Sequence, residues 1–164
     1  MKIRKTKLSE FDHIMKMYEA ARQFMKEHGN PDQWGKTNPP PELIMDDIKN
    51  GNSYVCVENE CIVATFFYHY GPDATYSEIY NGSWLSDSPY GVVHRITSSG
   101  SVKGAASFCL QWALDQCGNI RIDTHRDNFV MQNMLAKNGF ARCGIIYIKD
   151  GSERIAYQKE LKQD

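Results

Sequence analysis

The stretch that decides the fold is GVVHRITSSGSVKGAA, residues 91–106, where an apolar run meets small residues and then a helical segment. The pattern predicts a strand at 91–97 and a helix at 102–117. The first turn of a helix has main-chain N–H groups without partners and the positive end of the helix dipole, so a pyrophosphate would fit there. A purely structural strand-to-helix turn also needs small residues, and the spacing alone favours neither interpretation.

The same turn lacks the two common phosphate-binding fingerprints. It contains neither GxGxxG nor GxxxxGK[ST], which disfavours Rossmann-type dinucleotide binding and P-loop nucleotide hydrolysis. Lys103 would add one positive charge beside the expected anion site.

Working outward, the remaining chain alternates between strand and helix patterns. Further strands are predicted at 2–7, 53–57, 61–70, 76–84, 120–124, 140–148 and 154–158. Further helices are predicted from a capping box of Ser9 and Asp12 to about residue 28, and at 42–49 and 128–137. Helices that alternate with strands in the second half predict a mixed α/β sheet flanked by helices, with the hairpin 53–70 antiparallel.

Composition limits the functional classes. The length of 164 residues predicts one domain spanning 1–164, and a net charge of -1 argues against nucleic acid or an anionic membrane as a partner. The longest apolar run, 62–70, is too short to span a bilayer, and no secretory signal is recognisable, so we expect a cytoplasmic protein. Five cysteines without a CxxC pair and histidines without ligand spacing predict no disulfide framework and no metal site.

Two motifs carry a family resemblance. The segment SVKGAA, 101–106, resembles the [QR]-x-x-G-x-[GA] motif of the GNAT superfamily of acyl-CoA-dependent N-acetyltransferases, with Ser101 in place of Gln or Arg. The segment NFVMQNMLAKNGF, 128–140, resembles N-x-x-A-x-x-L-Y-x-x-x-G-F, with Leu135 at the tyrosine position. An ordinary helix capped by Asn128 and ended by Gly139 explains much of the second motif as well. The order of elements resembles the family over nearly the whole chain.

The resemblance implies a GNAT-like, mostly antiparallel sheet with one parallel, splayed strand pair, and acetyl-CoA as co-substrate. The pantetheine arm would pair with the main chain of the first splayed strand, and the pyrophosphate would meet amides at the start of the following helix. Asn128 would reach the pantetheine, and Met131 would line the thioester end. The implied cofactor-binding residues are Ile96, Thr97, Ser98, Val102, Lys103, Gly104, Ala105, Ala106, Asn128 and Met131.

Two residues are candidates for the catalytic base. His94 carries an imidazole, the side chain that ordinarily changes charge near neutral pH, but it shares strand parity with Val92 and Ile96, which also fits a core histidine bonded to main chain. Glu78 lies in an aromatic segment, where partial burial would raise its pKa toward the range that a general base needs. The alternative is that Glu78 is an exposed strand residue without a catalytic role. Asp123 and His125 are weaker candidates. The tyrosine acid that the family often uses is replaced by Leu135.

The acceptor pocket is expected between the Trp34 loop and the 76–84 segment, with Trp34, Glu78 and Trp84 as substrate-binding residues. Asp32, Glu78 and Asp87 would supply negative charge for a cationic amine. We therefore expect an N-acetyltransferase acting on a primary amine of a small molecule or peptide, as a monomer or homodimer. The replacements at Ser101 and Leu135 keep open a CoA-binding regulatory module without catalysis.

Overall fold

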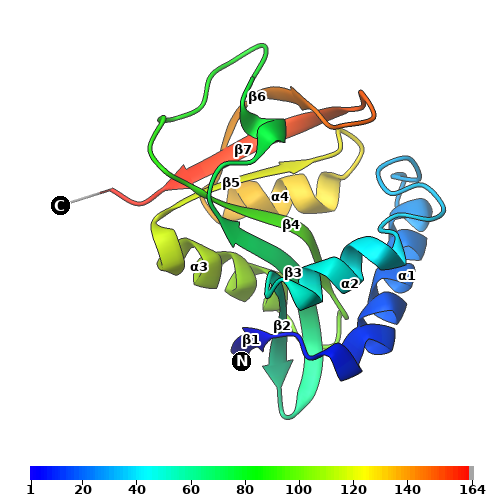
Figure 1. The fold of residues 1–164 in the computed structure, drawn as a ribbon. Coiled ribbons are helices and arrows are strands. Elements are labelled where there is room, and N and C mark those ends of the chain that lie inside the picture. The colour runs from blue at the N-terminus through cyan, green and yellow to red at the C-terminus, as the bar shows by residue number, and fades with distance from the viewer. Residues whose placement is uncertain (163–164) are drawn as a thin grey trace.

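The computed structural model describes residues 1–162 and contains a seven-stranded sheet with strand order β1-β2-β3-β4-β5-β7-β6 (Figure 1). The strands are β1 (Lys2–Lys5), β2 (Ser53–Glu58), β3 (Cys61–Tyr70), β4 (Gly91–Ser98), β5 (Asn119–Thr124), β6 (Ala141–Tyr147) and β7 (Glu153–Glu160). The helices are α1 (Phe11–Glu27), α2 (Pro41–Lys49), α3 (Ala105–Cys117) and α4 (Phe129–Lys137), with 3-10 turns at Leu8–Glu10 and Ala74–Tyr76. Neighbouring strands are antiparallel except β4 and β5, which confirms the predicted mixed sheet.

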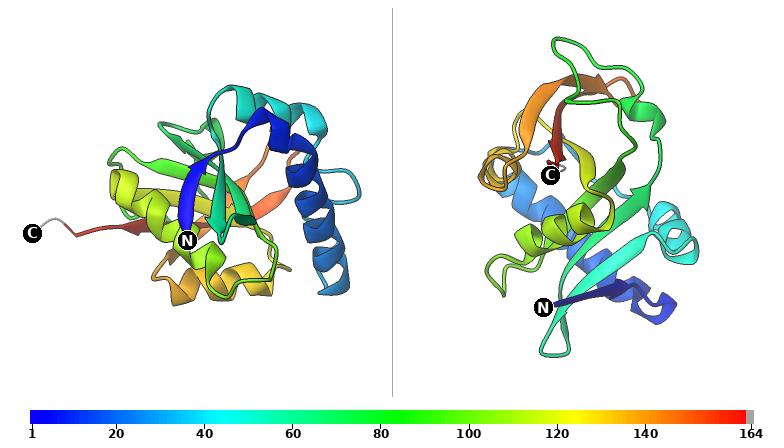
Figure 2. Two further views of the ribbon diagram at one scale, coloured as in Figure 1. Left: turned by 90° about the horizontal axis from the view of Figure 1, so that it is seen from below. Right: turned by 90° about the vertical axis from the view of Figure 1, so that its left-hand side faces the viewer.

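Both faces of the sheet are covered. Successive residues of a strand point to opposite sides, so neighbouring residues belong to different parts of the core. Cys56 of β2 belongs to the core under α3 and α4, which includes Leu110 and Leu135. Its neighbour Val55 packs on the other face against α1 and α2. Figure 2 shows α3 and α4 together on one side of the sheet, with α2 on the opposite side. The segment between β3 and β4 covers the rest of that second face, where Tyr76 is buried.

A β-bulge bends β4 in the middle of the sheet. Thr97 lies opposite Thr65 and His94 opposite Phe67, so β4 carries one extra residue between these pairs. Arg95, at the bulge, has a φ of 53°, a left-handed conformation that costs a non-glycine residue about 1–3 kcal/mol. The Arg95 guanidinium is held by an ion pair with Asp47 of α2 at 2.5 Å.

The bulge corrects the parity expected for the central strand. His94 does share a face with Val92, but Ile96 lies on the other face and packs against the α3 core. The extra residue reverses the alternation between His94 and Ile96, which an unbroken period of two cannot reveal.

The bulge also coincides with the point where β4 and β5 separate. The two strands pair only at Gly91 with Ile120 and at Val92 with Arg121, although β4 continues to Ser98 and β5 to Thr124. Residues 93–98 therefore have no strand partner on the β5 side. This is the splayed parallel pair that the sequence resemblance predicted.

Two local predictions were wrong. Residues 76–84 do not form a strand; the segment begins in a 3-10 turn, and its strand pairing is limited to an isolated bridge between Tyr80 and Ile145. Tyr76 and Trp84 of this segment pack onto the sheet, so much of the strand-like composition serves burial, whereas Tyr80 is exposed. The capping box also differs, because the Glu10 carboxylate accepts from the Lys7 N–H at 2.8 Å in place of the expected Ser9 and Asp12 pair.

Candidate active site

Two adjoining cavities open where β4 and β5 separate. The larger has a volume of about 790 Å³ and lies between α1, the end of β4 and the starts of α3 and α4. The smaller, of about 260 Å³, lies between the 33–40 loop, the bent part of β4, and β5. Four residues line both cavities: Met25, Ile96, Asn128 and Met131. The two spaces therefore share a wall at the splay.

The larger cavity is lined mainly by apolar side chains. Ile96, Thr97 and Ser98 supply its β4 side, and Asn128 and Met131 supply its α4 side. All five are among the residues that the family resemblance implies for cofactor binding. The opposite wall is the α1 helix, which the sequence analysis did not assign to the site. Its contributing residues are His13, Lys16, Met17, Ala20, Ala21, Phe24 and Met25. The helix itself was predicted, but nothing local indicated what α1 faces.

The turn into α3 reaches the larger cavity through Ala106, while Val102, Lys103, Gly104 and Ala105 do not line it. Gly104 caps the helix with a φ of 82°. The first helical hydrogen bond runs from the Phe108 N–H to the Gly104 carbonyl. The N–H groups of residues 105–107 precede that bond and have no acceptor within the helix, so the anion-binding end of α3 lies beside the cavity.

His94 lines the smaller cavity and is hydrogen-bonded to a carboxylate. Its Nε2 lies 2.8 Å from Asp73 Oδ2, and its ring packs near the rings of Phe67 and Tyr76. The bond to His94 is the main reason that the pKa of Asp73 falls to about 2. If Nε2 carries the proton donated to this carboxylate, Nδ1 is left as the ring's acceptor. The histidine is thus oriented by a carboxylate and accessible from the cavity.

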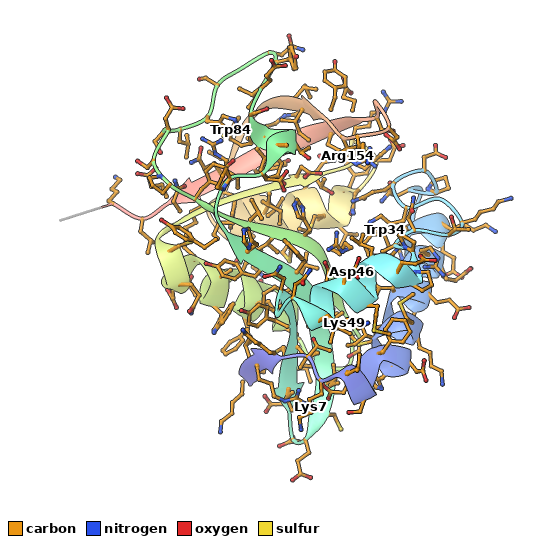
Figure 3. The ribbon with its side chains drawn as sticks, in the orientation of Figure 1. Lys7, Trp34, Asp46, Lys49, Trp84 and Arg154 are labelled. Carbon is orange, nitrogen blue, oxygen red and sulfur yellow. The ribbon has the colours of Figure 1, made fainter. Side chains whose placement is uncertain are left out.

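Glu78 and Trp84 lie away from both cavities. Glu78 is exposed and accepts a hydrogen bond from the Tyr80 hydroxyl at 2.7 Å. The Trp84 ring packs over the Arg121 guanidinium and donates to the Tyr76 carbonyl. Figure 3 shows Trp84 near β6 and β7, far from Trp34. The expected acceptor pocket between the Trp34 loop and residues 76–84 is therefore not formed as predicted.

The Trp34 loop does line the smaller cavity, and α4 helps to hold it there. Trp34 packs edge-on against the buried Tyr18 at 5.7 Å between ring centroids. The Asn128 side chain accepts from the Met131 N–H, which caps α4, and donates to Gln33 Oε1 at 2.8 Å. Asn128 therefore couples the helix that lines both cavities to the loop that closes the smaller one.

The charged lining of the smaller cavity was predicted only in part, through the candidate bases His94 and Asp123. Asp32 and Asp87 are exposed and line neither cavity, whereas Asp123 does, and its Oδ2 accepts from the Tyr76 hydroxyl at 2.6 Å. Arg154 of β7 also lines the cavity, although it is far along the chain. Thr124 is fully buried there, and its hydroxyl has no partner among residues 1–162.

His125, the other weak candidate for a base, lies outside both cavities. It is nearly buried, and its Nδ1 accepts from the Asp127 N–H at 3.0 Å. Burial, reinforced by the nearby charge of Arg154, lowers the pKa of His125. Its contacts are those of a residue that shapes the turn into α4.

Leu135, at the position of the family's tyrosine, is fully buried in the α3 core. Within residues 1–162, no group of three or more His, Cys, Asp or Glu side chains is arranged to hold a metal ion. No helix in this described part of the chain is both long enough and apolar enough to cross a membrane.

Comparison with solved structures gives extensive matches. An acetyltransferase of the GNAT family from Streptococcus agalactiae is 33% identical, with a TM-score of 0.89 over 99% of this chain and 96% of that one. One from Listeria monocytogenes is 20% identical, with a TM-score of 0.71 over 98% and 94%. A Salmonella typhimurium protein, whose structure includes its cofactor acetyl-CoA, is 14% identical, with a TM-score of 0.63 over 99% and 95%. No protein-family model matches the chain, and no curated protein does.

Proposed function

This chain belongs to the GNAT family of acetyltransferases, and from that premise we propose that it transfers the acetyl group of acetyl-CoA to a primary amine. The observation that carries the proposal is the shared wall between the two cavities. The larger cavity would hold acetyl-CoA and the smaller one the amine, so that their reacting groups meet beside Ile96 and Met131.

The residues present fit acetyl-CoA. Residues 93–98 have main-chain groups without a partner on the β5 side, which suits the amides of a pantetheine arm. The free N–H groups at the start of α3 suit a pyrophosphate, and a Cβ added at Gly100 or Gly104 would meet no atom within 4 Å. These features support a long ligand that is polar at one end and thin along its middle. Acetyl-CoA would supply an activated acyl group as its thioester.

His94 is the proposed general base. It lines the acceptor side, and the Asp73 carboxylate fixes its orientation and stabilises the protonated ring. The ammonium proton of the acceptor would pass to His94, directly or through one water, before the neutral amine attacks the thioester carbonyl. A C–N bond forms, the C–S bond breaks, and the electron pair leaves with sulfur. The second proton of the attacking nitrogen would pass through water to the departing thiolate. Glu78, which faces neither cavity, is the less suitable base.

The position at which the family often has a tyrosine acid for the leaving thiolate is occupied by Leu135, which is buried in the core. A thiol has an ordinary pKa of about 8.5, so a thiolate is a fair leaving group near neutral pH. We therefore propose departure without a side-chain acid.

The test is acetyl-CoA binding followed by an amine screen. We expect acetyl-CoA to raise the melting temperature, because a ligand that binds only the folded state stabilises it. We expect release of free thiol to depend on an added amine. If saturating acetyl-CoA does not raise the melting temperature, the proposal is contradicted. Binding without turnover on any amine would favour the regulatory module suggested by Ser101 and Leu135.

A further inference from the structure

Three arginines lie largely inside this fold, and different groups contact the positive charge of each. Arg95 is ion-paired with Asp47. Arg121 lies between the rings of Trp84 and Tyr90, each 4.1 Å from its guanidinium carbon, and donates to the Ser86 carbonyl.

Arg154, the third, is only 5% exposed and donates to the carbonyls of Gln33 at 3.0 Å and Glu153 at 2.9 Å. It forms no ion pair with any carboxylate of residues 1–162. A buried charge is costly unless it is paired. Arg121 likewise forms no ion pair, but two aromatic rings cover its guanidinium and it lines neither cavity. Arg154 is therefore the buried cation without a counter-ion that lines a cavity.

The uncompensated guanidinium lines the smaller cavity. Its bond to Gln33 ties it to the loop that closes this space, and Figure 3 shows Arg154 and Trp34 at the same end of the molecule. Burial lowers the pKa of Arg154, and the negative charges of Asp123 and Asp150 oppose this shift; arginine stays charged near neutral pH. A ligand with an anionic group would supply the missing partner.

Asp123 places an opposite charge nearby. It lies opposite Ala156 in the β5–β7 ladder and is the diagonal neighbour of Arg154, at a spacing of about 7–8 Å on the same face. The two side chains form no ion pair with each other. Tyr76 connects Asp123 to the catalytic side, because its hydroxyl donates to Asp123 and its ring lies 5.8 Å from the His94 ring.

We propose that the acceptor is a small α-amino acid, or an amine of similar size with an adjacent carboxylate, whose carboxylate is bound by Arg154 while its amino group lies toward Asp123. The inference rests on the proposed acetyl transfer and names its substrate class. A zwitterion matches one cationic and one anionic side chain without leaving a net buried charge. A phosphate-bearing amine would bring excess negative charge next to Asp123.

The size of the cavity supports a small ligand. Its volume of about 260 Å³ is below the roughly 300–1,000 Å³ of pockets for drug-sized ligands.

The experiment compares each amino acid with its decarboxylated amine and its carboxamide. Alanine with ethylamine, leucine with isopentylamine, phenylalanine with phenethylamine and tryptophan with tryptamine keep the side chain constant. Leaving one partner of a buried charge pair unmatched costs about 2–5 kcal/mol, so we expect kcat/KM to be about 30-fold or more higher for the amino acid of the preferred pair. Equal turnover of both members overturns the inference but leaves the proposed acetyl transfer intact. Turnover of no member of any set contradicts both.

Arg154→Met tests the residue. The variant should lose the preference, so that the kcat/KM ratio between amino acid and amine approaches one, mainly through KM. Arg154→Lys should restore part of it, because lysine keeps the charge but lacks the planar fork. Arg142→Met, on an exposed arginine of the neighbouring strand β6, is the matched control and should retain the full preference. If Arg154→Met retains it too, Arg154 does not bind the carboxylate. If Arg154→Met fails to fold, the wild-type comparison still decides the substrate class.

Discussion

The larger and smaller cavities are built from different kinds of groups. The larger one is lined mainly by apolar side chains and adjoins the end of β4 and the starts of α3 and α4, where main-chain groups lack partners. Its titratable lining residues are His13, Lys16, His28 and Asp127. The smaller one combines titratable and charged side chains, including His94, Asp123 and Arg154, from three separate strands. Main-chain groups at the ends of helices and strands can bind the same ligand in many different sequences. Charged side chains differ between sequences, so they can select a particular ligand. The first cavity therefore suits a fixed co-substrate, and the second suits a particular acceptor.

The largest expected effect is a loss of the acetyl-transfer rate without a loss of acetyl-CoA binding. His94→Gln should lower kcat/KM for amine acetylation by about 10²–10⁴-fold, because glutamine cannot take the ammonium proton. Acetyl-CoA binding, measured by thermal shift, should persist, because His94 lines only the smaller cavity.

Glu78→Gln is the control for this prediction, since it changes the rival carboxylate, which is exposed and outside both cavities. It should leave the rate unchanged. A normal rate in His94→Gln, or a loss confined to Glu78→Gln, would contradict the assignment of the base to the smaller cavity.

The next effect concerns the anion-binding end of α3. Gly104→Glu should weaken acetyl-CoA binding about 100-fold, because opposing like charges cost several kcal/mol. The residue also has a φ of 82°, which strains any side chain. Gly151→Glu is matched, with a φ of 86° and equally open surroundings, but lies in the turn between β6 and β7. Titration calorimetry should find normal affinity in Gly151→Glu. If both variants bind acetyl-CoA with equal affinity, the turn into α3 does not take part in cofactor binding.

The contrast between the cavities also explains what the sequence could predict. The strand, turn and helix at 91–117 and the capped helix ending before Gly139 are local patterns, and they predicted the β4 and α4 sides of the larger cavity. The splay was implied by the family resemblance, and the α1 wall was not predicted. Gly139 has the expected positive φ, at 82°. Local patterns specify element ends, and the end of β4 and the starts of α3 and α4 form one side of that cavity.

The smaller cavity could not be predicted in the same way. The partner of His94, Asp73, comes from the irregular segment just before the 3-10 turn Ala74–Tyr76, and only the pairing of β7 with β5 makes Arg154 a neighbour of Asp123. The bulge at Arg95 reversed the expected parity of Ile96. These are long-range or irregular features, and periodicity carries no information about them.

A smaller effect is expected at the wall that both cavities share. Asn128→Ala should lower the free energy of unfolding by about 0.5–2 kcal/mol, the usual cost of losing an N-cap. It also removes the bond to Gln33 of the loop that closes the smaller cavity. Urea unfolding should find most of this stability restored in Asn128→Asp, whose carboxylate can still accept from the Met131 N–H. If the alanine and aspartate variants are equally unstable, the cap is not what holds α4.

The smallest effect is a pH dependence that only the charged cavity should produce. The pKa of Asp73 is about 2 in the folded chain, chiefly because of its bond to His94, whereas an unfolded aspartate has a pKa of about 3.9. The unfolded state therefore takes up the proton first as pH falls. The stabilisation is complete above about pH 4, declines between about pH 4 and 2, and is lost below the folded pKa. The stability difference between wild type and Asp73→Asn should shrink over this interval in urea unfolding at stepped pH. Asp32→Asn, on an exposed loop aspartate, should show no such interval. A wild-type advantage over Asp73→Asn that is constant from pH 7 to 2 would mean that the carboxylate stabilises the cavity by packing and not by its charge.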